Sequence, residues 1–304
     1  MSLGVNNVPY KTCSYSCVYC QLGRTINLIA ERRVFFDPEE IVREVARALA
    51  SGRADYVTFV PDGEPTLDIN LGREIVGVKE LVSVPVAVLT NSSLLFLEDV
   101  RADLSNADLV SLKVDTVDES LWKRLNRPHP KLKLSRVLEG IEVFSREFSG
   151  KIITETMIVE NLNSSVDVLE SVAEFIRESV KPEKAYLSIP IRPPAEPFVR
   201  APPAEKLVEA FELFARKIGR DRVELLNMPE PPHFHPSGDP ASWLLRVVSV
   251  HPMRLDYALD SLREKSEDPE AIIRDLESRG EIRLVEYEGK LFIIRNYKTR
   301  EKRA

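Results

Sequence analysis

Three cysteines near the start of the chain are the residues best suited to chemistry. Cys13, Cys17 and Cys20 are the only cysteines in 304 residues, and they fall within eight consecutive positions, here called the Cys loop. An odd number of thiols this close together cannot form a disulfide framework, and reduced thiols indicate a reducing compartment. Closely spaced thiolates are ligands for zinc or for an iron–sulfur cluster. The spacing therefore indicates a metal centre.

Two kinds of metal centre are compatible with three clustered cysteines. A structural zinc site usually has four closed ligands in paired spacing. The chain has no second CxxC pair, and its four histidines stand at positions 129, 233, 235 and 251. A [4Fe–4S] cluster held by three cysteines leaves one iron open to a substrate or cofactor. A zinc knuckle completed by a distant histidine and the chance clustering of buried cysteines remain as alternatives.

The elements that must position these thiols follow a repeating pattern. Up to about residue 227, short apolar, β-branched runs alternate with amphipathic stretches, which is typical of βα units around a parallel sheet. The expected strands lie near 3–7, 56–60, 86–90, 109–114, 152–159, 185–191 and 223–227. The expected helices lie near 37–50, 69–82, 118–126, 135–147, 165–179 and 203–217. The predicted fold class is α/β, a partial (βα)6 TIM-like barrel.

The last part of the chain differs in character. Residues 228–241 are rich in proline and turn formers, which predicts a linker between a barrel domain at 1–227 and a small domain at 242–304. The small domain is expected to contain three short helices followed by a hairpin with a two-residue turn, at 242–250, 254–262, 269–279 and 282–295. This order of elements predicts a winged helix.

Polar residues at the ends of the predicted strands are the next candidates. In a βα barrel, functional side chains collect at the carboxyl ends of the strands. Besides the Cys loop, such segments are PDGEPTLD at 61–68, TNSS at 90–93 and SLKVD at 111–115. The apolar residues within 110–114 suit a helix-packed face, so Ser111, Lys113 and Asp115 are expected to point into the barrel. A charged pair that lines a cavity is a candidate for function.

These motifs resemble those of the radical S-adenosylmethionine (SAM) superfamily, in the branch that contains the tRNA wyosine synthases. The resemblance covers the first 120 residues, in SLGVNNVPYKTCSYSCVYCQLGRT, DGEPTLDIN, LTNSSLL and SLKVDT. It implies a [4Fe–4S] cluster on Cys13, Cys17 and Cys20, with SAM on the open iron. One electron would split SAM into methionine and a 5′-deoxyadenosyl radical that abstracts hydrogen from the substrate. Wyosine synthases carry further cysteines for a second cluster, which this chain lacks.

The resemblance also implies roles for other residues. Gly63, Glu64 and Pro65 match a motif in which backbone carbonyls or the glutamate accept hydrogen bonds from the SAM amino group. The other candidates for binding the cofactor are Tyr19, Asn91, Ser92, Ser111, Lys113, Ser188 and Pro190. The candidate catalytic residues are Lys113, Asp115 and Arg192. Ordinary turns at 63–66 and 90–93, a rigid connection at 192–203 and a solvated His129 are the alternatives.

Charge limits the partners. The net charge of −6 gives no general case for binding nucleic acid, so RNA binding would need a local basic patch. The third small-domain helix is too acidic for duplex DNA. The hairpin and tail are more basic, although a solvated tail is the alternative, and their cations are Lys290, Arg295, Lys298, Arg300, Lys302 and Arg303.

The expected location is the cytoplasm. The chain has no run of 18 apolar residues and no apolar signal core at its start, which predicts neither a membrane span nor secretion. A single glutamine and many charged residues and prolines favour a thermophilic source. The main hypothesis is a radical SAM enzyme with a macromolecular substrate, RNA rather than protein, and a donor such as ferredoxin or flavodoxin. The competing hypothesis is a non-catalytic metal-binding regulator that signals through the winged helix.

Overall fold

The computed structural model of the protein describes residues 2–50, 54–226, 238–250 and 252–296. Contacts between residues divide the chain into two units. Unit 1 comprises Met1–Tyr19, Arg24–Pro190 and Phe198–Asn227. Unit 2 comprises Cys20–Gly23, Ile191–Pro197 and Met228–Ala304. Most of the predicted linker at 228–241 and the basic tail from Lys298 to Arg303 lie outside the described residues.

A parallel sheet of seven strands forms the centre of unit 1. The strands pair in chain order, β1-β4-β5-β6-β7-β8-β9, and every pairing is parallel. Their bounds are β1 Ser2–Val5, β4 Tyr56–Phe59, β5 Val86–Thr90, β6 Leu109–Lys113, β7 Lys151–Met157, β8 Lys184–Ser188 and β9 Val223–Leu226. Two short strands, β2 (Thr12–Cys13) and β3 (Asn27–Leu28), form a separate parallel pair. The predicted α/β class with a parallel sheet is confirmed.

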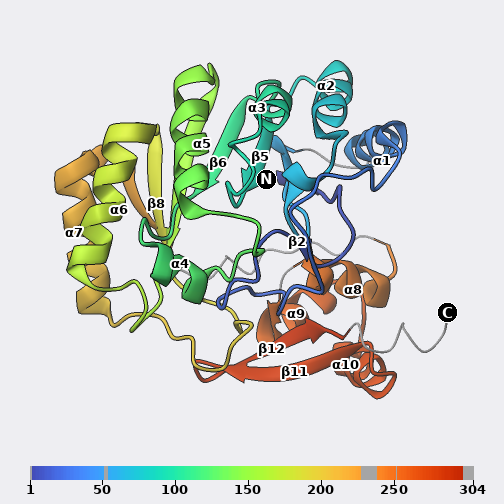
Figure 1. Cartoon of the computed structure of the whole chain (residues 1–304). Coiled ribbons are helices and arrows are strands. Elements are labelled where there is room, and N and C mark those ends of the chain that lie inside the picture. Colours follow the sequence, from blue (N-terminus) through green and yellow to red (C-terminus); the bar gives the residue numbers. More distant parts are fainter. Residues whose placement is uncertain (1, 51–53, 227–237, 251, 297–304) are drawn as a thin grey trace. The chain divides into compact units, whose positions relative to one another are not determined.

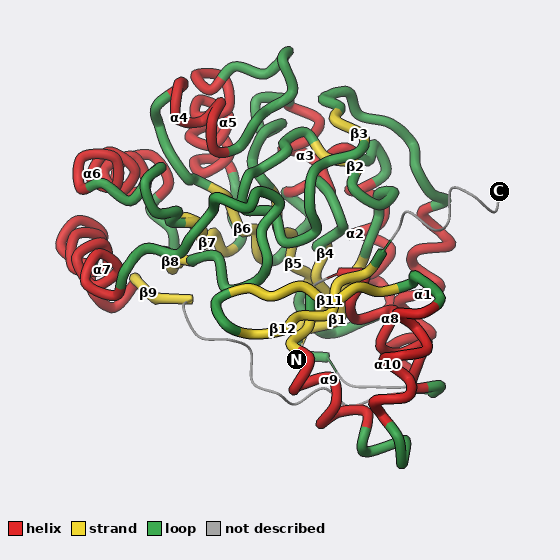
Figure 2. The backbone as a smooth tube through the Cα atoms, turned by 90° about the horizontal axis from the view of Figure 1, so that it is seen from below, coloured by secondary structure: helices red, strands yellow, loops and turns green. Residues whose placement is uncertain are grey.

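Helices connect and flank these strands (Figures 1 and 2). Their bounds are α1 Pro38–Ala50, α2 Leu71–Leu81, α3 Glu98–Leu104, α4 Glu119–Leu125, α5 Leu134–Glu147, α6 Val166–Phe175 and α7 Ala204–Ile218. Shorter helical turns lie at Pro65–Leu67, Ile176–Val180 and Arg220–Arg222. The start of α1 follows from local sequence, because the Asp37 carboxylate accepts a hydrogen bond from Glu39 N at 3.1 Å and Pro38 stands at the first helical position.

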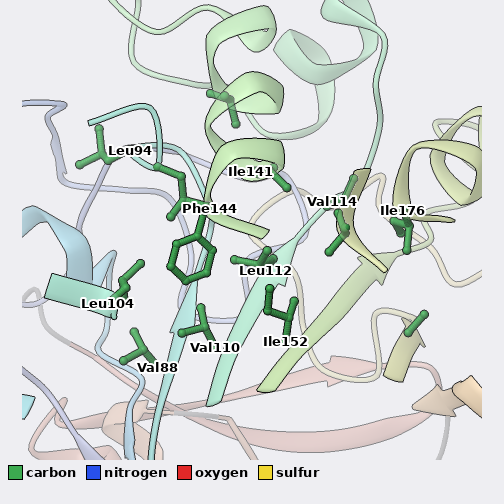
Figure 3. Packing of buried hydrophobic residues seen from close by; sticks show 14 of the residues in the cluster. Val88, Leu94, Leu104, Val110, Leu112, Val114, Ile141, Phe144, Ile152 and Ile176 are labelled. Carbon is green, nitrogen blue, oxygen red and sulfur yellow. The ribbon is translucent and has the colours of Figure 1, made fainter. Parts of the chain in front are cut away.

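The main core lies between the sheet and the helices. Val110 and Leu112 of β6 are fully buried, and Val114 just after it is 3% exposed. Figure 3 shows them on the side of the sheet that faces Phe144 of α5. Since side chains alternate along a strand, Ser111 and Lys113 point to the opposite, inner side. The predicted division of this strand into a helix-packed face and an inner polar face is thus present in the fold.

Unit 2 has a core of its own in its C-terminal part. The elements follow the order α8 Pro240–Val250, β10 Met253–Arg254, α9 Leu255–Leu262, α10 Pro269–Ser278, β11 Ile282–Tyr287 and β12 Lys290–Arg295. The strands form an antiparallel sheet in the order β10-β12-β11. Its hairpin turn has positive φ at Glu288 (48°) and Gly289 (68°), as a two-residue turn requires. The helices and the hairpin lie where the sequence places them, and the winged-helix assignment stays a prediction.

Within the described residues, no helix combines the length and the apolar character that crossing a bilayer requires.

Candidate functional site

The Cys loop starts at the end of β2 and is fixed by its own apolar residues. Tyr15 and Val18 are buried, whereas all three cysteines are partly exposed and none forms a disulfide. The Tyr15 ring packs edge-on against Trp122 of α4, with 5.6 Å between ring centroids. The loop therefore has an apolar side that packs on the barrel, which leaves the thiols accessible.

A second loop, at residues 125–129, holds the Cys loop through its backbone. Ser16 N donates to Asn126 O at 3.0 Å, and Val18 N donates to Leu125 O at 2.9 Å. His129 N donates to Ser14 O at 2.8 Å, while the imidazole Nδ1 accepts from Lys131 N at 3.3 Å. The contribution of His129 to this site is thus a backbone contact.

Two side-chain amides donate to the cysteine sulfurs. Asn91 Nδ2 lies 3.5 Å from Cys13 Sγ and 2.8 Å from Ser14 Oγ. Asn126 Nδ2 lies 3.6 Å from Cys17 Sγ. Hydrogen bonds to ligand sulfurs are one of the factors that set the reduction potential of an iron–sulfur cluster. Asn91 was a candidate from the sequence, whereas Asn126 was not, because no local pattern marks it.

Glu64 joins two of the predicted loops from the inside. It is 1% exposed, and its Oε1 accepts from Thr66 N (3.1 Å), Thr66 Oγ1 (2.6 Å) and Thr90 Oγ1 (2.6 Å). Its Oε2 accepts from Asn91 N at 2.7 Å. Burial raises the pKa of Glu64, and these hydrogen bonds act against that rise. Both carboxylate oxygens therefore fix the end of β5 to the turn at residues 63–66, here called the GEPT turn.

Gly63 allows this turn to approach the Cys loop. A Cβ atom at position 63 would lie 1.8 Å from Thr12 O, and Glu64 N donates to the same carbonyl at 3.1 Å. Any side chain at position 63 would have to displace backbone. Pro65 opens the short helical turn at Pro65–Leu67. The three residues of this motif thus bring the second loop against β2.

The inner face of the sheet carries an ion pair. Lys113 Nζ lies 2.9 Å from Glu155 Oε1, and Ser188 Oγ lies 2.7 Å from the same oxygen. Lys113 also lies over the Tyr19 ring, 5.1 Å from its centroid. Burial lowers the pKa of Lys113, but the charges of Glu155 and Asp115 outweigh it and hold this pKa above its usual value. Burial raises the pKa of Glu155, but Lys113 and Ser188 hold it below its usual value.

Glu155 was missed by the sequence analysis. Its position opposite Lys113 comes from the register of β6 against β7, in which Lys113 and Glu155 are paired residues. The only local signal is the alternation in β7, where Thr154 and Thr156 are buried and Glu155 is not. The ion pair was therefore not accessible without the strand register.

Asp115 is the centre of a hydrogen-bond network next to this pair. Its Oδ2 accepts from Tyr19 OH and from Asn126 Nδ2 (2.8 Å), and its Oδ1 accepts from Met157 N (2.8 Å). Asn126 Nδ2 also lies 3.2 Å from Tyr19 OH. Burial, followed by the charge of Asp115, raises the pKa of Tyr19 well above its usual value. The network links the inner face of the sheet to Tyr19, the residue directly before Cys20.

The remaining site residues predicted from sequence are either buried in unit 1 or belong to unit 2. Ser92 is buried with φ of 68°, and its Oγ accepts from Lys113 N at 3.0 Å, so its hydroxyl supports the end of β6. Ser111 and Pro190 are also buried. Cys20 and Arg192 belong to the segments of unit 2, in which Arg192 Nη1 donates to Gln21 Oε1 at 2.8 Å.

The chemistry of the donor set fits a thiolate-bound cluster. Three partly exposed thiols are available on one loop, and amide N–H groups point at two of their sulfurs. In the part of the chain that the structure describes, no group of three or more His, Cys, Asp or Glu side chains forms a site for a single metal ion.

Comparison with known proteins identifies the family to which the chain is similar. A model of the radical SAM superfamily matches residues 7–172. A UPF0026 protein of Methanocaldococcus jannaschii is 43% identical over 304 aligned residues, which cover 99% of this chain and 94% of that protein. A UPF0026 protein of a Synechocystis strain is 36% identical over 63% of this chain and 71% of its own length.

Solved structures confirm the predicted partial barrel. SuiB of Streptococcus suis is 15% identical with a TM-score of 0.55, and the likeness covers 75% of this chain and 49% of SuiB. Native anSMEcpe, solved with AdoMet and the Kp18Cys peptide, is 16% identical with a TM-score of 0.53, covering 74% of this chain and 63% of that one. The chain thus corresponds to about half of SuiB, and at these identities the likeness concerns the fold. The family match spans more than half of the sequence, so the chain is a radical SAM enzyme and belongs to the radical SAM superfamily.

Proposed function

We propose that this enzyme holds a [4Fe–4S] cluster through Cys13, Cys17 and Cys20 and binds SAM at the open iron. Once reduced, such a cluster would supply the electron for cleavage of SAM, and this chemistry would allow hydrogen abstraction from a macromolecular substrate. We favour RNA over protein as that substrate. Ferredoxin or flavodoxin is the proposed electron donor.

The observation that carries this proposal is the contact of amides with the thiols. Asn91 and Asn126 come from two different loops, and each donates to a different cysteine sulfur of the superfamily motif. Such donors stabilise negative charge on sulfur, which is the state a thiolate ligand must adopt. Each amide is itself fixed: the Asn91 Oδ1 accepts from Ser93 N at 3.0 Å, and the Asn126 Nδ2 donates to Asp115 Oδ2 at 2.8 Å. The surroundings of both thiols are therefore organised by the chain's own hydrogen bonds.

Lys113 is the proposed partner of the SAM carboxylate. Its ammonium group is charged, since Glu155 and Asp115 raise its pKa, and its side chain is only 16% exposed. Lys113 Nζ and Ser188 Oγ both donate to Glu155 Oε1, which holds the ion pair on the inner face of the sheet. Because this charge already pairs with Glu155, the SAM carboxylate would have to share the ammonium group with the Glu155 carboxylate.

Asp115 is proposed as a positioning residue. Its carboxylate oxygens accept three hydrogen bonds, from Tyr19, Asn126 and the Met157 backbone. It therefore orients the Asn126 amide that reaches Cys17. For the SAM amino group, the backbone carbonyls at 62–65 are the proposed acceptors. The Glu64 carboxylate already accepts from Thr66, Thr90 and Asn91, whereas a carbonyl oxygen that accepts one hydrogen bond keeps a second lone pair.

Anaerobic reconstitution tests the cofactors. Full-length protein incubated with iron and sulfide is expected to bind about four of each and, with dithionite and SAM, to release 5′-deoxyadenosine. Single Cys→Ala variants at positions 13, 17 and 20 are expected to lose both the bound iron and sulfide and the formation of 5′-deoxyadenosine. Protein that instead binds one zinc per chain and leaves SAM intact would rule out the proposal and support a metal-binding regulator.

The substrate class has its own test. Total RNA from a deletion strain and its parent is digested and compared by mass spectrometry of nucleosides. We expect one modified nucleoside to disappear in the deletion strain and to return on complementation with the wild-type gene, but not with a Cys17→Ala variant. Unchanged nucleosides together with an altered peptide would reassign the substrate to protein.

A further inference from the structure

Unit 1 has a pocket that contains none of the residues proposed for the SAM site. It has a volume of about 600 Å³ and is lined by Arg124, Arg127, Glu160, Asn161, Leu162, Phe198 and Arg200. These residues come from the end of α4 and from the segments that follow β7 and β8. The pocket, here called the Arg pocket, thus lies where the carboxyl ends of the strands place functional loops.

The charge of the Arg pocket is positive although the chain as a whole is acidic. Three of its residues are arginines, whereas its one acid, Glu160, is already compensated. Glu160 Oε1 accepts from Lys206 Nζ at 2.6 Å, and Oε2 accepts from Ser164 Oγ at 3.0 Å. The Lys206 hydrogen bond, more than any other contact, holds the pKa of Glu160 below its usual value. This is the kind of local basic patch that a chain with a net charge of −6 needs in order to bind an anionic polymer.

An exposed aromatic ring stands beside these cations. Phe198 is 56% exposed, while its neighbour Val199 is fully buried. The segment is also fixed by a backbone hydrogen bond from Glu160 N to Arg200 O at 3.0 Å. Aromatic side chains next to arginines are typical of sites that bind unpaired nucleotides, because bases stack on the ring and phosphates bind the guanidinium groups.

The Arg pocket and the Cys loop share one small apolar cluster. Val18, Leu125, Val159 and Val199 are fully buried together. Leu125, Val159 and Val199 are each next in sequence to residues that line the pocket. Val18 lies between Cys17 and Tyr19 in the Cys loop. Val18 N donates to Leu125 O at 2.9 Å, which fixes the loop to the end of α4. A ligand in the pocket is therefore held at a defined position relative to the Cys loop.

Two residues of the pocket have a left-handed backbone. Arg127 has φ of 45°, which an arginine rarely adopts, and Asn161 has φ of 60°, which asparagine adopts more readily. Conformations of this kind persist where the surroundings enforce them, and they concentrate at binding sites.

We propose that the Arg pocket binds an unpaired nucleotide of the RNA substrate, with phosphates on Arg124, Arg127 and Arg200 and a base stacked on Phe198. This inference rests on the proposed function for its RNA substrate and adds the site that holds it. Binding here would anchor the RNA beside the Cys loop through the shared apolar cluster. The wide exposure of Phe198 leaves its face available to a base.

Binding of a fluorescent RNA to the reconstituted full-length protein tests the proposal. The probe is a hairpin with an unpaired loop, and its anisotropy is followed between low and moderate salt. Phe198→Ala is expected to weaken binding roughly fivefold to a hundredfold, the range expected for one lost base–aromatic stack. Arg124→Ala with Arg200→Ala is expected to lower the slope of log K against log salt by about 2.

Matched controls separate the pocket from bulk charge. Arg47 and Arg73 are 71% and 66% exposed on α1 and α2, and Arg47→Ala with Arg73→Ala removes the same charge elsewhere on unit 1. This control is expected to bind within about twofold of wild type. A DNA hairpin of the same sequence and an acidic peptide serve as competing probes. The proposal would be overturned by an equal loss of RNA binding in the control, by unchanged binding of Phe198→Ala protein with native circular dichroism, or by equally tight binding of either competing probe. The measurement needs neither SAM nor an electron donor, so its outcome is independent of SAM cleavage.

Discussion

Asn126 connects several parts of the candidate site through one side chain and its backbone. Its amide nitrogen reaches Cys17 Sγ, Tyr19 OH and Asp115 Oδ2 at 3.6, 3.2 and 2.8 Å. Its backbone carbonyl also accepts from Ser16 N. One side chain thus couples the Cys loop to the inner face of the sheet.

The loss of this amide is the first prediction. Asn126→Leu keeps the size of the side chain but removes the donor to Cys17 and leaves Asp115 with one partner fewer. Removal of such an outer hydrogen bond typically lowers metal affinity or activity about 10- to 100-fold. We expect the rate of 5′-deoxyadenosine formation to fall by this factor. The midpoint reduction potential of the cluster is also expected to change.

Asn106→Leu provides the matched control. The Asn106 amide donates to the backbone oxygens of Ala102 and Asp103 at the end of α3, away from the thiols. Its variant is expected to keep the wild-type midpoint. A wild-type midpoint and rate in Asn126→Leu would show that the amide does not act on the cluster.

At the level of elements, the site depends on how closely two loops can pack. The GEPT turn follows β4, the Cys loop follows β2, and the absent side chain of Gly63 lets them touch. Glu64 then fixes the turn to the end of β5. The geometry at the thiols is therefore set by contacts between loops, which the parallel sheet brings to one edge.

Gly63→Ala tests this packing. The new Cβ would lie 1.8 Å from Thr12 O, so the backbone of one loop has to move. Overpacking of this kind typically costs about 1–3 kcal/mol in the free energy of unfolding. We expect a lower melting temperature and reduced iron content after reconstitution.

Gly4→Ala is the control for that substitution. A Cβ at Gly4 would meet Val60 Cγ1 at 3.5 Å, an ordinary van der Waals distance. Its melting temperature and iron content are expected to match those of wild type. If Gly63→Ala behaves like Gly4→Ala, the close approach of the loops is not required for the cluster.

The strands were more predictable from sequence than the contacts between them. Each expected strand of the barrel overlaps an observed one, because buried parallel strands are continuous apolar runs. Helix α3 was not predicted, since it has only seven residues and Leu97 before it makes no side-chain cap. Glu155 and Asn126 were missed because register and loop packing, rather than local pattern, place them beside Lys113 and Cys17.

At the scale of the whole molecule, charge is distributed unevenly. The chain is acidic overall, yet the Arg pocket is positive and the inner face of the sheet holds a compensated ion pair. A third group of charges is buried around α2. Glu74 is fully buried there, close to Asp68 and Asp103, with Arg32 bound to Asp103.

This buried group gives the protein a stability that depends on pH. Burial, together with the charge of Asp68, raises the pKa of Glu74 to about 8, while Asn7 Nδ2 donates to its Oε2 at 3.1 Å. The ordinary value of 4.5 applies to the unfolded chain, so between these two values the folded state keeps a proton that the unfolded state has lost. The free energy of unfolding must therefore fall as the pH rises from about 5 to 8. Burial also raises the pKa of Asp68, to about 6, so this residue lowers the free energy of unfolding over a lower pH range, from about 4 to 6.

Glu74→Gln should remove most of this dependence, because glutamine can still accept from Asn7 and does not ionise. The expected difference from wild type is on the order of 4 kcal/mol at pH 8, as an upper limit, and about 1 kcal/mol or less at pH 5. Urea unfolding is followed in a Trp243→Phe background, where the buried Trp122 reports unit 1 alone. Glu80→Gln, at an exposed position of the same helix, serves as the control. Parallel pH profiles for Glu74→Gln and its parent would mean that Glu74 is ionised in the folded protein and that its burial is compensated by neighbours other than Asn7.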